Sequence, residues 1–220
     1  LALCARRTDR LAELAIEITT AHPGRRVVVK ALDVTDHDAV FRVFDEFRDE
    51  LGGIDRVVVN AGLGKGQPLG TGRFDANRET AETNVIGALA QTEAAAAIFR
   101  AQGAGHLVMV SSFSALRGMP KNITTYAATK AAVAHLAEGF RADVHGTPIK
   151  VTVLYPGYIV SEMSGTSART PLMASTEKGV RAMVEAIEKE KKSAVVPAWP
   201  WVPLGFVVKR VPAGLLRRMS

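Results

Sequence analysis

Tyr126 and Lys130 have the residue types and the spacing of an acid–base pair. They lie near the start of the segment TTYAATKAAVAHLAEGF, residues 124–140, which we expect to be a helix. Side chains four residues apart share a helix face, so the phenol and the ammonium can approach the same point. Lowering the pKa of a phenol from about 10 to about 7 takes about 4 kcal/mol. An ammonium at ~4 Å supplies about this much at an effective dielectric constant of about 20. A solvated surface pair is the alternative.

The elements that must position this pair alternate along the chain. Apolar runs predict strands, and they are RRVVVKALDV, IDRVVVNAG, GHLVMVSS and IKVTVLYPG. Between them, apolar residues at helical spacing predict helices with one buried stripe each around residues 11–18, 40–51 and 180–187. This alternation is typical of βαβ units, and it predicts an α/β fold with a parallel sheet in a single domain.

Residues that could bind a ligand or take part in catalysis directly follow the predicted strands. In open parallel sheets, ligands bind beyond the carboxyl ends of the strands. The predicted strands are followed by small, polar or turn-forming residues, and these are Ala5, Arg6, Arg7, Asp33, Val34, Asn60, Ala61, Gly62, Ser111, Ser112, Pro156 and Gly157. We therefore expect a flat ligand to approach the backbone at this edge.

Five of these sequence features occur in an order that resembles the short-chain dehydrogenase/reductase family. They are NAG at 60–62, Asn84 in TNVIGAL, the serines 111 and 112, YAATK at 126–130 and PGYIVSEM at 156–163. The similarity covers most of the chain. It implies a Rossmann-like, doubly wound parallel sheet in a three-layer α/β/α arrangement. It also implies reversible hydride transfer between a nicotinamide and a carbonyl or alcohol.

The resemblance assigns roles to four residues. Tyr126 would be the proton donor that carbonyl reduction requires, and Lys130 would also hold the nicotinamide ribose. Ser112 would hydrogen-bond the substrate oxygen. Asn84 would bend its helix and support a water-linked proton path to the lysine. In the family, the helices that carry Asn84 and Tyr126 often build an interface, so a homodimer or homotetramer is expected.

The serine assignment depends on spacing. The family places its serine thirteen residues before the tyrosine, where this chain has Phe113. One inserted residue in MPKNITT, after Pro120, would make Ser112 the functional serine. Ser114 is the runner-up, and hydrogen bonding at a strand end or turn is the structural alternative for all three serines.

The cofactor preference depends on the residues that follow the apolar run LALC, residues 1–4. NAD-binding relatives carry an acidic residue there that hydrogen-bonds the ribose hydroxyls, whereas this chain has Ala5 followed by Arg6 and Arg7. A guanidinium can bind a 2′-phosphate bidentately, so NADP(H) is favoured over NAD(H). By resemblance, Asp33 and Val34 border the adenine, while Ile159 and Ser161 contact the carboxamide.

The start of the chain departs from the family pattern. The first strand and its glycine-rich turn, which would precede LALCARR, are not in the sequence, and Gly62, Gly64 and Gly66 do not have the spacing to replace them. In the strand order 3-2-1-4-5-6 that strand is central, so two strands should lack a neighbour. We expect the domain of residues 1–220 to be incomplete at its N-terminus, by roughly 15 to 25 residues, enough for one strand and its turn.

Two segments bear on the substrate. By resemblance, residues 161–173 form the lid over it. The tail, residues 194–220, is apolar and then basic, and Pro197, Pro200 and Pro203 argue against a regular helix. Trp199, Trp201, Leu204 and Phe206 are candidates to line an apolar pocket, with packing against the lid or a partner subunit as the alternative. The apolar run of the tail falls short of the ~20 residues needed to span a bilayer, and the four basic residues beyond it could contact a membrane surface or an acidic acyl carrier. A lipophilic or acyl-type substrate is expected.

Composition limits the other classes. Net charge is +6 and the basic residues are scattered, which does not predict a nucleic-acid surface. A single cysteine, Cys4, favours a reducing cytoplasm. The five histidines show no metal-ligand spacing, and no G-x-S-x-G elbow of a serine hydrolase is present. The alternative from another class is a non-catalytic binding protein with this fold and an impaired nucleotide site.

Overall fold

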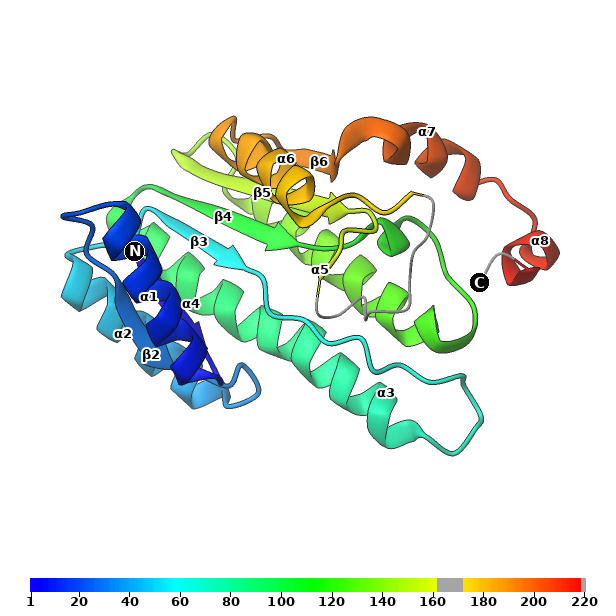
Figure 1. Ribbon diagram of the computed structural model, residues 1–220, viewed down its shortest axis with the longest axis horizontal. Coiled ribbons are helices and arrows are strands. Elements are labelled where there is room, and N and C mark those ends of the chain that lie inside the picture. The colour runs from blue at the N-terminus through cyan, green and yellow to red at the C-terminus, as the bar shows by residue number, and fades with distance from the viewer. Residues whose placement is uncertain (162–171, 219–220) are drawn as a thin grey trace.

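Six parallel strands form two sheets in the computed structural model, which describes residues 1–161 and 172–218 (Figure 1). In the smaller sheet β1 (Ala2–Ala5) pairs with β2 (Val28–Ala31). The larger sheet has the order β3 (Arg56–Val59), β4 (Gly105–Val110), β5 (Ile149–Pro156) and β6 (Ser193–Val196). The four predicted apolar runs are all strands. The prediction missed β6, which is the first part of the segment assigned to the tail.

Helices cover both faces of the larger sheet, so the three-layer prediction is confirmed. The helices are α1 (Thr8–Ala21), α2 (His37–Leu51), α3 (Phe74–Ala81), α4 (Gly87–Gln102), α5 (Thr124–Asp143), α6 (Thr176–Glu188), α7 (Ala198–Val208) and α8 (Ala213–Arg218). On one face, α2, α4 and α5 pack on the strands around the buried residues Phe99, Leu107 and Met109. On the other face, α6 covers Val108 and Leu154.

The sheet is divided between β1 and β3, in agreement with the expectation that two strands lack a neighbour. Within the part of the chain that the structure describes, β1 pairs only with β2, and β3 pairs only with β4 and not with β1. The consequence is visible at α1, which packs on the narrow two-stranded sheet and has no buried residue among Thr8–Ala21. Its expected buried stripe is therefore wrong here, and Leu14 is 40% exposed.

The other two predicted stripes differ in outcome. Val40, Val43, Phe44 and Phe47 of α2 are buried as expected, and the helix begins with a side-chain cap from Asp36. In α6, Met183 and Ile187 pack against the cluster of Val108 and Leu154 as expected, whereas Val180 and Val184 are exposed. Gly179 lets this helix approach the segment after β5 closely, because a Cβ on Gly179 would lie 2.6 Å from Ile159.

The proline-rich tail does form a helix, which corrects the sequence-based expectation. Trp199 has extended backbone angles and interrupts α7, and helical geometry continues beyond it with Pro203 inside. Pro200 and Pro203 fall in the first turn after Trp199, where few N–H groups have an acceptor within the helix. The prolines therefore cost little hydrogen bonding at these positions.

Candidate active site

Tyr126 and Lys130 lie on the first two turns of α5 and face the same region, as predicted. Lys130 is 4% exposed, and its Nζ donates a hydrogen bond of 2.9 Å to the carbonyl oxygen of Val110 at the end of β4. The same Nζ lies 5.9 Å from the centroid of the Tyr126 ring. The alternative of a solvated surface pair is wrong for Lys130, whose ammonium is buried beside a strand end.

The electrostatics differ from the simple expectation. Burial raises the pKa of the Tyr126 phenol, and a hydrogen bond with Ser112 acts in the opposite direction. Burial also lowers the pKa of Lys130 to about 8. The expected shift of the phenol toward neutrality is therefore not seen in the protein alone. The physical reason is that Nζ is directed to a carbonyl oxygen, while the loss of solvent acts on both groups.

The three candidate serines have different partners. Ser111 is buried and donates a hydrogen bond of 2.7 Å to the carbonyl oxygen of Lys130, so it joins β4 to α5. Ser112 lies close enough to the phenol of Tyr126 to act against the rise of its pKa. The backbone N–H and the hydroxyl of Ser114 both donate to the hydroxyl oxygen of Ser112, at 3.2 and 3.0 Å. Ser112 is thus the serine that the fold brings to the phenol, and Ser114 orients it.

Asn84 lies behind the pair, inside a π-helical turn, Glu82–Ile86, between α3 and α4. Its side chain is 1% exposed and fully used: Oδ1 accepts from the N–H of Leu63, and Nδ2 donates to the carbonyl of Leu63 and to the hydroxyl of Thr129. π-helical turns are frequent at functional sites. The π-helical turn lies where the bend was expected, and the Asn84 side chain joins the loop after β3 to α5.

Gly62 completes this cluster. A Cβ atom on Gly62 would lie 3.0 Å from Nζ of Lys130 and 3.6 Å from Oδ1 of Asn84. The backbone after β3 thus approaches the ammonium more closely than a side chain would comfortably allow. Asn60 is exposed and Ala61 half-buried in the same loop.

The residues expected to bind the adenosine lie together at the end of the smaller sheet. Arg6 is exposed, and its Nη1 is 3.8 Å from a carboxylate oxygen of Asp33. The carboxylate accepts hydrogen bonds from the N–H and hydroxyl of Thr35, which hold the pKa of Asp33 low. Val34 packs on α4, where a Cβ on Gly87 would lie 2.9 Å from it. Arg7 is also exposed.

The residues after β5 are covered by α7. A Cβ on Gly157 would lie 2.2 Å from the ring of Trp201, and this buried tryptophan meets Phe113 and Tyr158 edge to face. Ile159 packs on α6 at Gly179, and Ser161 is exposed. Of the predicted lid, 161–173, residues 162–171 lie outside the described part of the structure.

Four aromatic or aliphatic residues of the tail were candidates for one pocket, and the structure separates them. Trp201 is 3% exposed and Leu204 half-buried, whereas Trp199 and Phe206 are 75% and 64% exposed. The prediction is wrong for Trp199 and Phe206, because they lie on the outward side of α7.

Sequence reasoning missed Thr129 as a member of the cluster. Its hydroxyl donates to the carbonyl of Tyr126 at 2.8 Å and accepts from Asn84 at 3.0 Å. Its place next to Lys130 in YAATK was the available signal.

Residues 1–161 and 172–218 contain no group of His, Cys, Asp and Glu side chains arranged to hold a metal ion. Among the helices of that same part of the chain, none combines the length and apolarity needed to cross a bilayer.

A parallel sheet with a tyrosine, a lysine and a serine gathered at its strand ends defines a Rossmann-like oxidoreductase. The model of the short chain dehydrogenase family matches residues 1–172, and this chain belongs to that family. Uncharacterized oxidoreductases of two Mycobacterium tuberculosis strains are 51% identical over 220 residues, covering 100% of this chain and 87% of theirs. An uncharacterized oxidoreductase of Myxococcus xanthus is 33% identical, covering 89% of this chain and 76% of its own. Among solved structures, a short-chain type dehydrogenase/reductase from Mycobacterium marinum is 28% identical with a TM-score of 0.79, covering 89% of this chain and 83% of that one.

Proposed function

We propose that this oxidoreductase is NADP(H)-dependent and interconverts a carbonyl and an alcohol by hydride transfer. The observation that carries the proposal is the buried Lys130 ammonium, whose Nζ lies 5.9 Å from the centroid of the Tyr126 ring, with Ser112 near the phenol. A buried, partly compensated ammonium costs free energy, so its presence at a strand end points to chemistry rather than to stability.

In this proposal each residue acts at a named atom. The hydroxyl of Ser112 orients the substrate oxygen, and the phenol of Tyr126 gives that oxygen a proton during reduction or removes one during oxidation. Lys130 stabilises the phenolate form by its charge. Asn84 and Thr129 position α5, because their hydrogen bonds join it to the π-helical turn and the loop after β3. When bound, the nicotinamide supplies or accepts the hydride.

The residues present fit a nucleotide along the strand ends. Gly62 leaves the space in front of the Lys130 ammonium that a Cβ atom would fill, so the ammonium can reach a ribose hydroxyl. In the same proposal Asn60, Ala61, Pro156 and Gly157 supply backbone contacts. Val34 and Asp33 border the adenine, while Ile159 and Ser161 approach the carboxamide.

The preference for NADP(H) depends on Arg6. Its pair with Asp33 is solvent-exposed, and such pairs are weak enough for a phosphate to replace. Arg6→Asp should weaken NADPH binding about 10- to 100-fold, the equivalent of one hydrogen bond to a charged group, and should improve NADH binding. The measurement is the dissociation constant of each cofactor by fluorescence titration. Arg42→Asp, on the exposed side of α2, is the control. If the ratio of the NADPH and NADH dissociation constants were unchanged in Arg6→Asp, the phosphate-binding role of Arg6 would be rejected.

A non-catalytic binding protein is the second candidate, and the separation of β1 from β3 favours it. The gap lies at the place where a nucleotide would bind in an open parallel sheet. The same titration with unmodified protein decides between the two, since absence of binding for both NADPH and NADH would favour the second.

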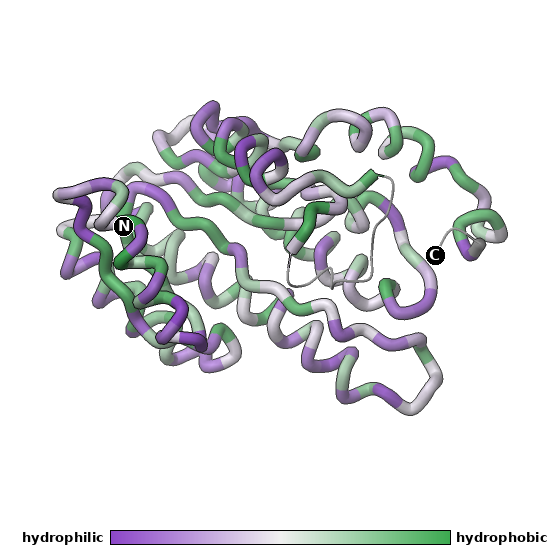
Figure 2. The backbone as a smooth tube through the Cα atoms, in the orientation of Figure 1, coloured by the Kyte–Doolittle hydropathy of each residue, from purple (hydrophilic) through white to green (hydrophobic). Residues whose placement is uncertain are grey.

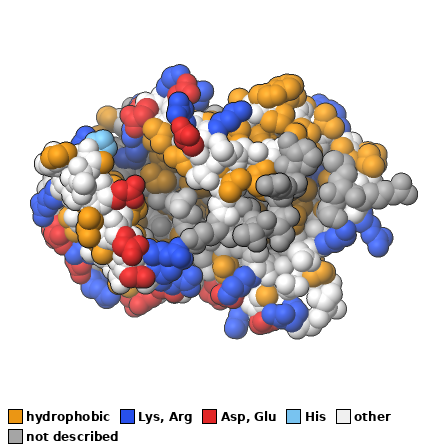
Figure 3. Space-filling view, viewed as in Figure 1, with side chains coloured by type: hydrophobic (Ala, Val, Ile, Leu, Met, Phe, Trp, Pro, Cys, Tyr) orange, Lys and Arg blue, Asp and Glu red, His pale blue; other side chains and the backbone are white. Residues whose placement is uncertain are grey.

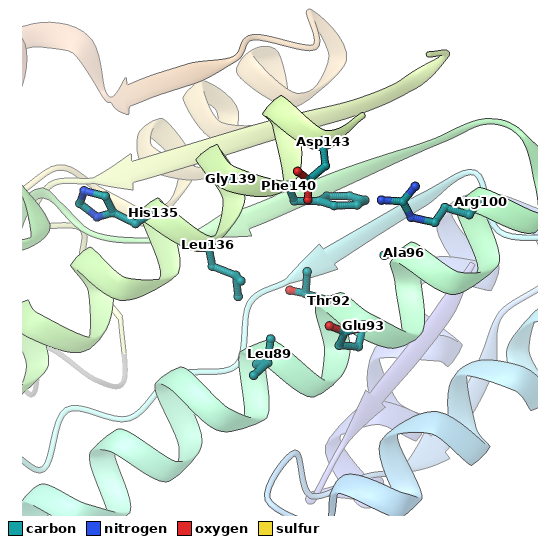
Figure 4. A pocket seen from close by; sticks show the side chains of 10 residues that line it. All are labelled: Leu89, Thr92, Glu93, Ala96, Arg100, His135, Leu136, Gly139, Phe140 and Asp143. Carbon is teal, nitrogen blue, oxygen red and sulfur yellow. The ribbon is translucent and has the colours of Figure 1, made fainter. Parts of the chain in front are cut away.

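Substrate, compartment and assembly are also part of the proposal. The aromatic group of Phe113, Tyr158 and Trp201 beside Ser112 and Tyr126 supports a lipophilic or acyl-type substrate. Cys4, half-buried and unpaired, supports the cytoplasm. A homodimer or homotetramer would use α4 and α5, whose outer faces form a groove (Figure 4).

This groove has the composition of an interface between copies. Leu89 lines the groove on the side of α4 and is 37% exposed, Leu136 lines it on the side of α5, and Arg100 lies over the ring of Phe140 (Figure 4). Leu89→Glu should convert the oligomer to monomer, because a carboxylate would be buried at a symmetric contact. Light scattering after gel filtration measures the mass. Phe41→Glu, 43% exposed on α2, should leave the mass unchanged, and an equal effect of both variants would contradict this interface.

A further inference from the structure

Helix α7 is apolar on two sides, although only one side packs on the protein. On the inner side Trp201, Gly205 and Val208 are buried, at the spacing of one helical stripe. A Cβ on Gly205 would lie 3.1 Å from Leu116, which shows how closely this side fits the loop after β4. The inner side is therefore explained by packing.

Packing within the described part of the chain does not explain why the outer side of α7 is apolar. Trp199, Val202 and Phe206 are 75%, 41% and 64% exposed, and the helical spacing of Val202 and Phe206 aligns their side chains on one face. Val207 beside them is 57% exposed, and Leu215 of α8 is 50% exposed. Figure 3 shows hydrophobic side chains gathered over this end of the molecule. We call Trp199, Val202, Phe206 and Val207 the α7 surface.

Positive charge follows the α7 surface directly. Lys209, Arg210 and Arg217 are exposed, and the sequence contains no Asp or Glu after Glu190. Figure 2 shows the same change, from a hydrophobic end of α7 to hydrophilic residues. The end of the helix is held in place by Arg117, whose guanidinium donates to the carbonyls of Val208 and Val211. The α7 surface is therefore apolar, is joined to the loop after β4 through Arg117, and is followed along the chain by basic residues.

These features select one kind of partner. A helix of 11 residues is too short to span a bilayer but long enough to lie in its interface. Exposed Trp and Phe side chains with neighbouring cations and no acidic residue match an anionic lipid interface in hydrophobicity and in charge. We propose that the α7 surface docks on anionic phospholipid membranes.

The docking helix also forms a wall of the candidate active site. Trp201, on its inner side, contacts Phe113 and Tyr158, and Phe113 follows Ser112 in the chain. Docking would place this wall next to the lipid phase. Entry of a lipophilic substrate from the bilayer would follow only if the proposed function holds. Docking itself is tested by membrane binding, without a turnover measurement.

Flotation with vesicles tests the proposal on the full chain. The protein should float with vesicles of phosphatidylcholine and phosphatidylglycerol in equal amounts, should stay unbound with phosphatidylcholine alone, and should be released by high salt. Trp199→Ser combined with Phe206→Ser should lower the partition coefficient by at least about tenfold. Lys209→Glu combined with Arg210→Glu should lower it about tenfold or more.

The control is a pair of equally exposed residues elsewhere. Phe74→Ser on α3 and Ile16→Ser on α1, where the wild-type side chains are 74% and 66% exposed, should leave partition unchanged. A measurement on unmodified protein avoids any folding defect: tryptophan emission should shift to shorter wavelength with anionic vesicles and should be quenched by brominated lipid. Absence of flotation, or an equal loss in the control pair, would overturn the proposal. Binding to an acidic carrier protein without vesicle binding would overturn it too. The proposal would also be overturned if the protein did not bind vesicles and the double variant Trp199→Ser with Phe206→Ser dissociated an oligomer.

Discussion

Tyr126→Phe is expected to lower turnover by about 10²- to 10⁴-fold, the usual contribution of a positioned proton donor. The phenol ring remains, so the packing of α5 against the loop after β4 should be kept. NADPH affinity should change by no more than a few fold, because the substitution removes only the hydroxyl, which lies near Ser112. Steady-state rates with a panel of lipophilic ketones, together with cofactor titration, measure both quantities.

The matched control for this substitution is Tyr155→Phe. Tyr155 is half-buried at the end of β5 and, like Tyr126, has a phenol whose pKa is raised by burial. Its hydroxyl should be dispensable for turnover. If Tyr126→Phe retained full turnover, Tyr126 would be removed from the mechanism, while equal losses in both variants would indicate a folding effect.

Lys130→Met should have the second large effect, and unlike Tyr126→Phe it should act on both turnover and binding. Loss of the ammonium removes the charge that stabilises the phenolate, so turnover should fall by about 10²-fold or more. It also removes a charged donor to the ribose, which should weaken NADPH binding by about tenfold or more. Lys150→Met, on the exposed side of β5, is the control. A variant that binds NADPH normally would contradict the second role.

The pH dependence follows from the same lysine. Its pKa is lowered to about 8 by burial, so the ammonium is present below this pH and is lost above it. Reduction should therefore decline as pH rises through about 8. Lys130→Arg keeps a charge at all these pH values, because a guanidinium has a pKa above about 12. In that variant the decline should disappear from the pH profile, provided that it still binds NADPH, and a profile identical to wild type would assign the titration to another group.

Local sequence was sufficient for the elements that are defined by neighbours along the chain. The apolar runs at β2 to β5, the buried stripe of α2, and the approach of Tyr126 and Lys130 on one helix face were all predicted correctly. Each depends on a periodicity within about one or two turns or strand repeats. The strand-end rule also predicted that Arg6 and Asp33 lie at one edge, and they are 3.8 Å apart there.

Long-range packing decided the rest. Burial raised the pKa of Tyr126 and lowered that of Lys130, although the spacing alone predicted an acidic phenol. Only the path of the chain after β4 shows that Ser112 meets the phenol while Ser111 joins β4 to α5. The sequence by itself determined which groups could react and on which elements they lie, since these follow from residue type and local period. The tertiary structure decided which face of α1, α6 and α7 is covered and which hydroxyl is used, because solvent exclusion depends on residues that are distant in sequence.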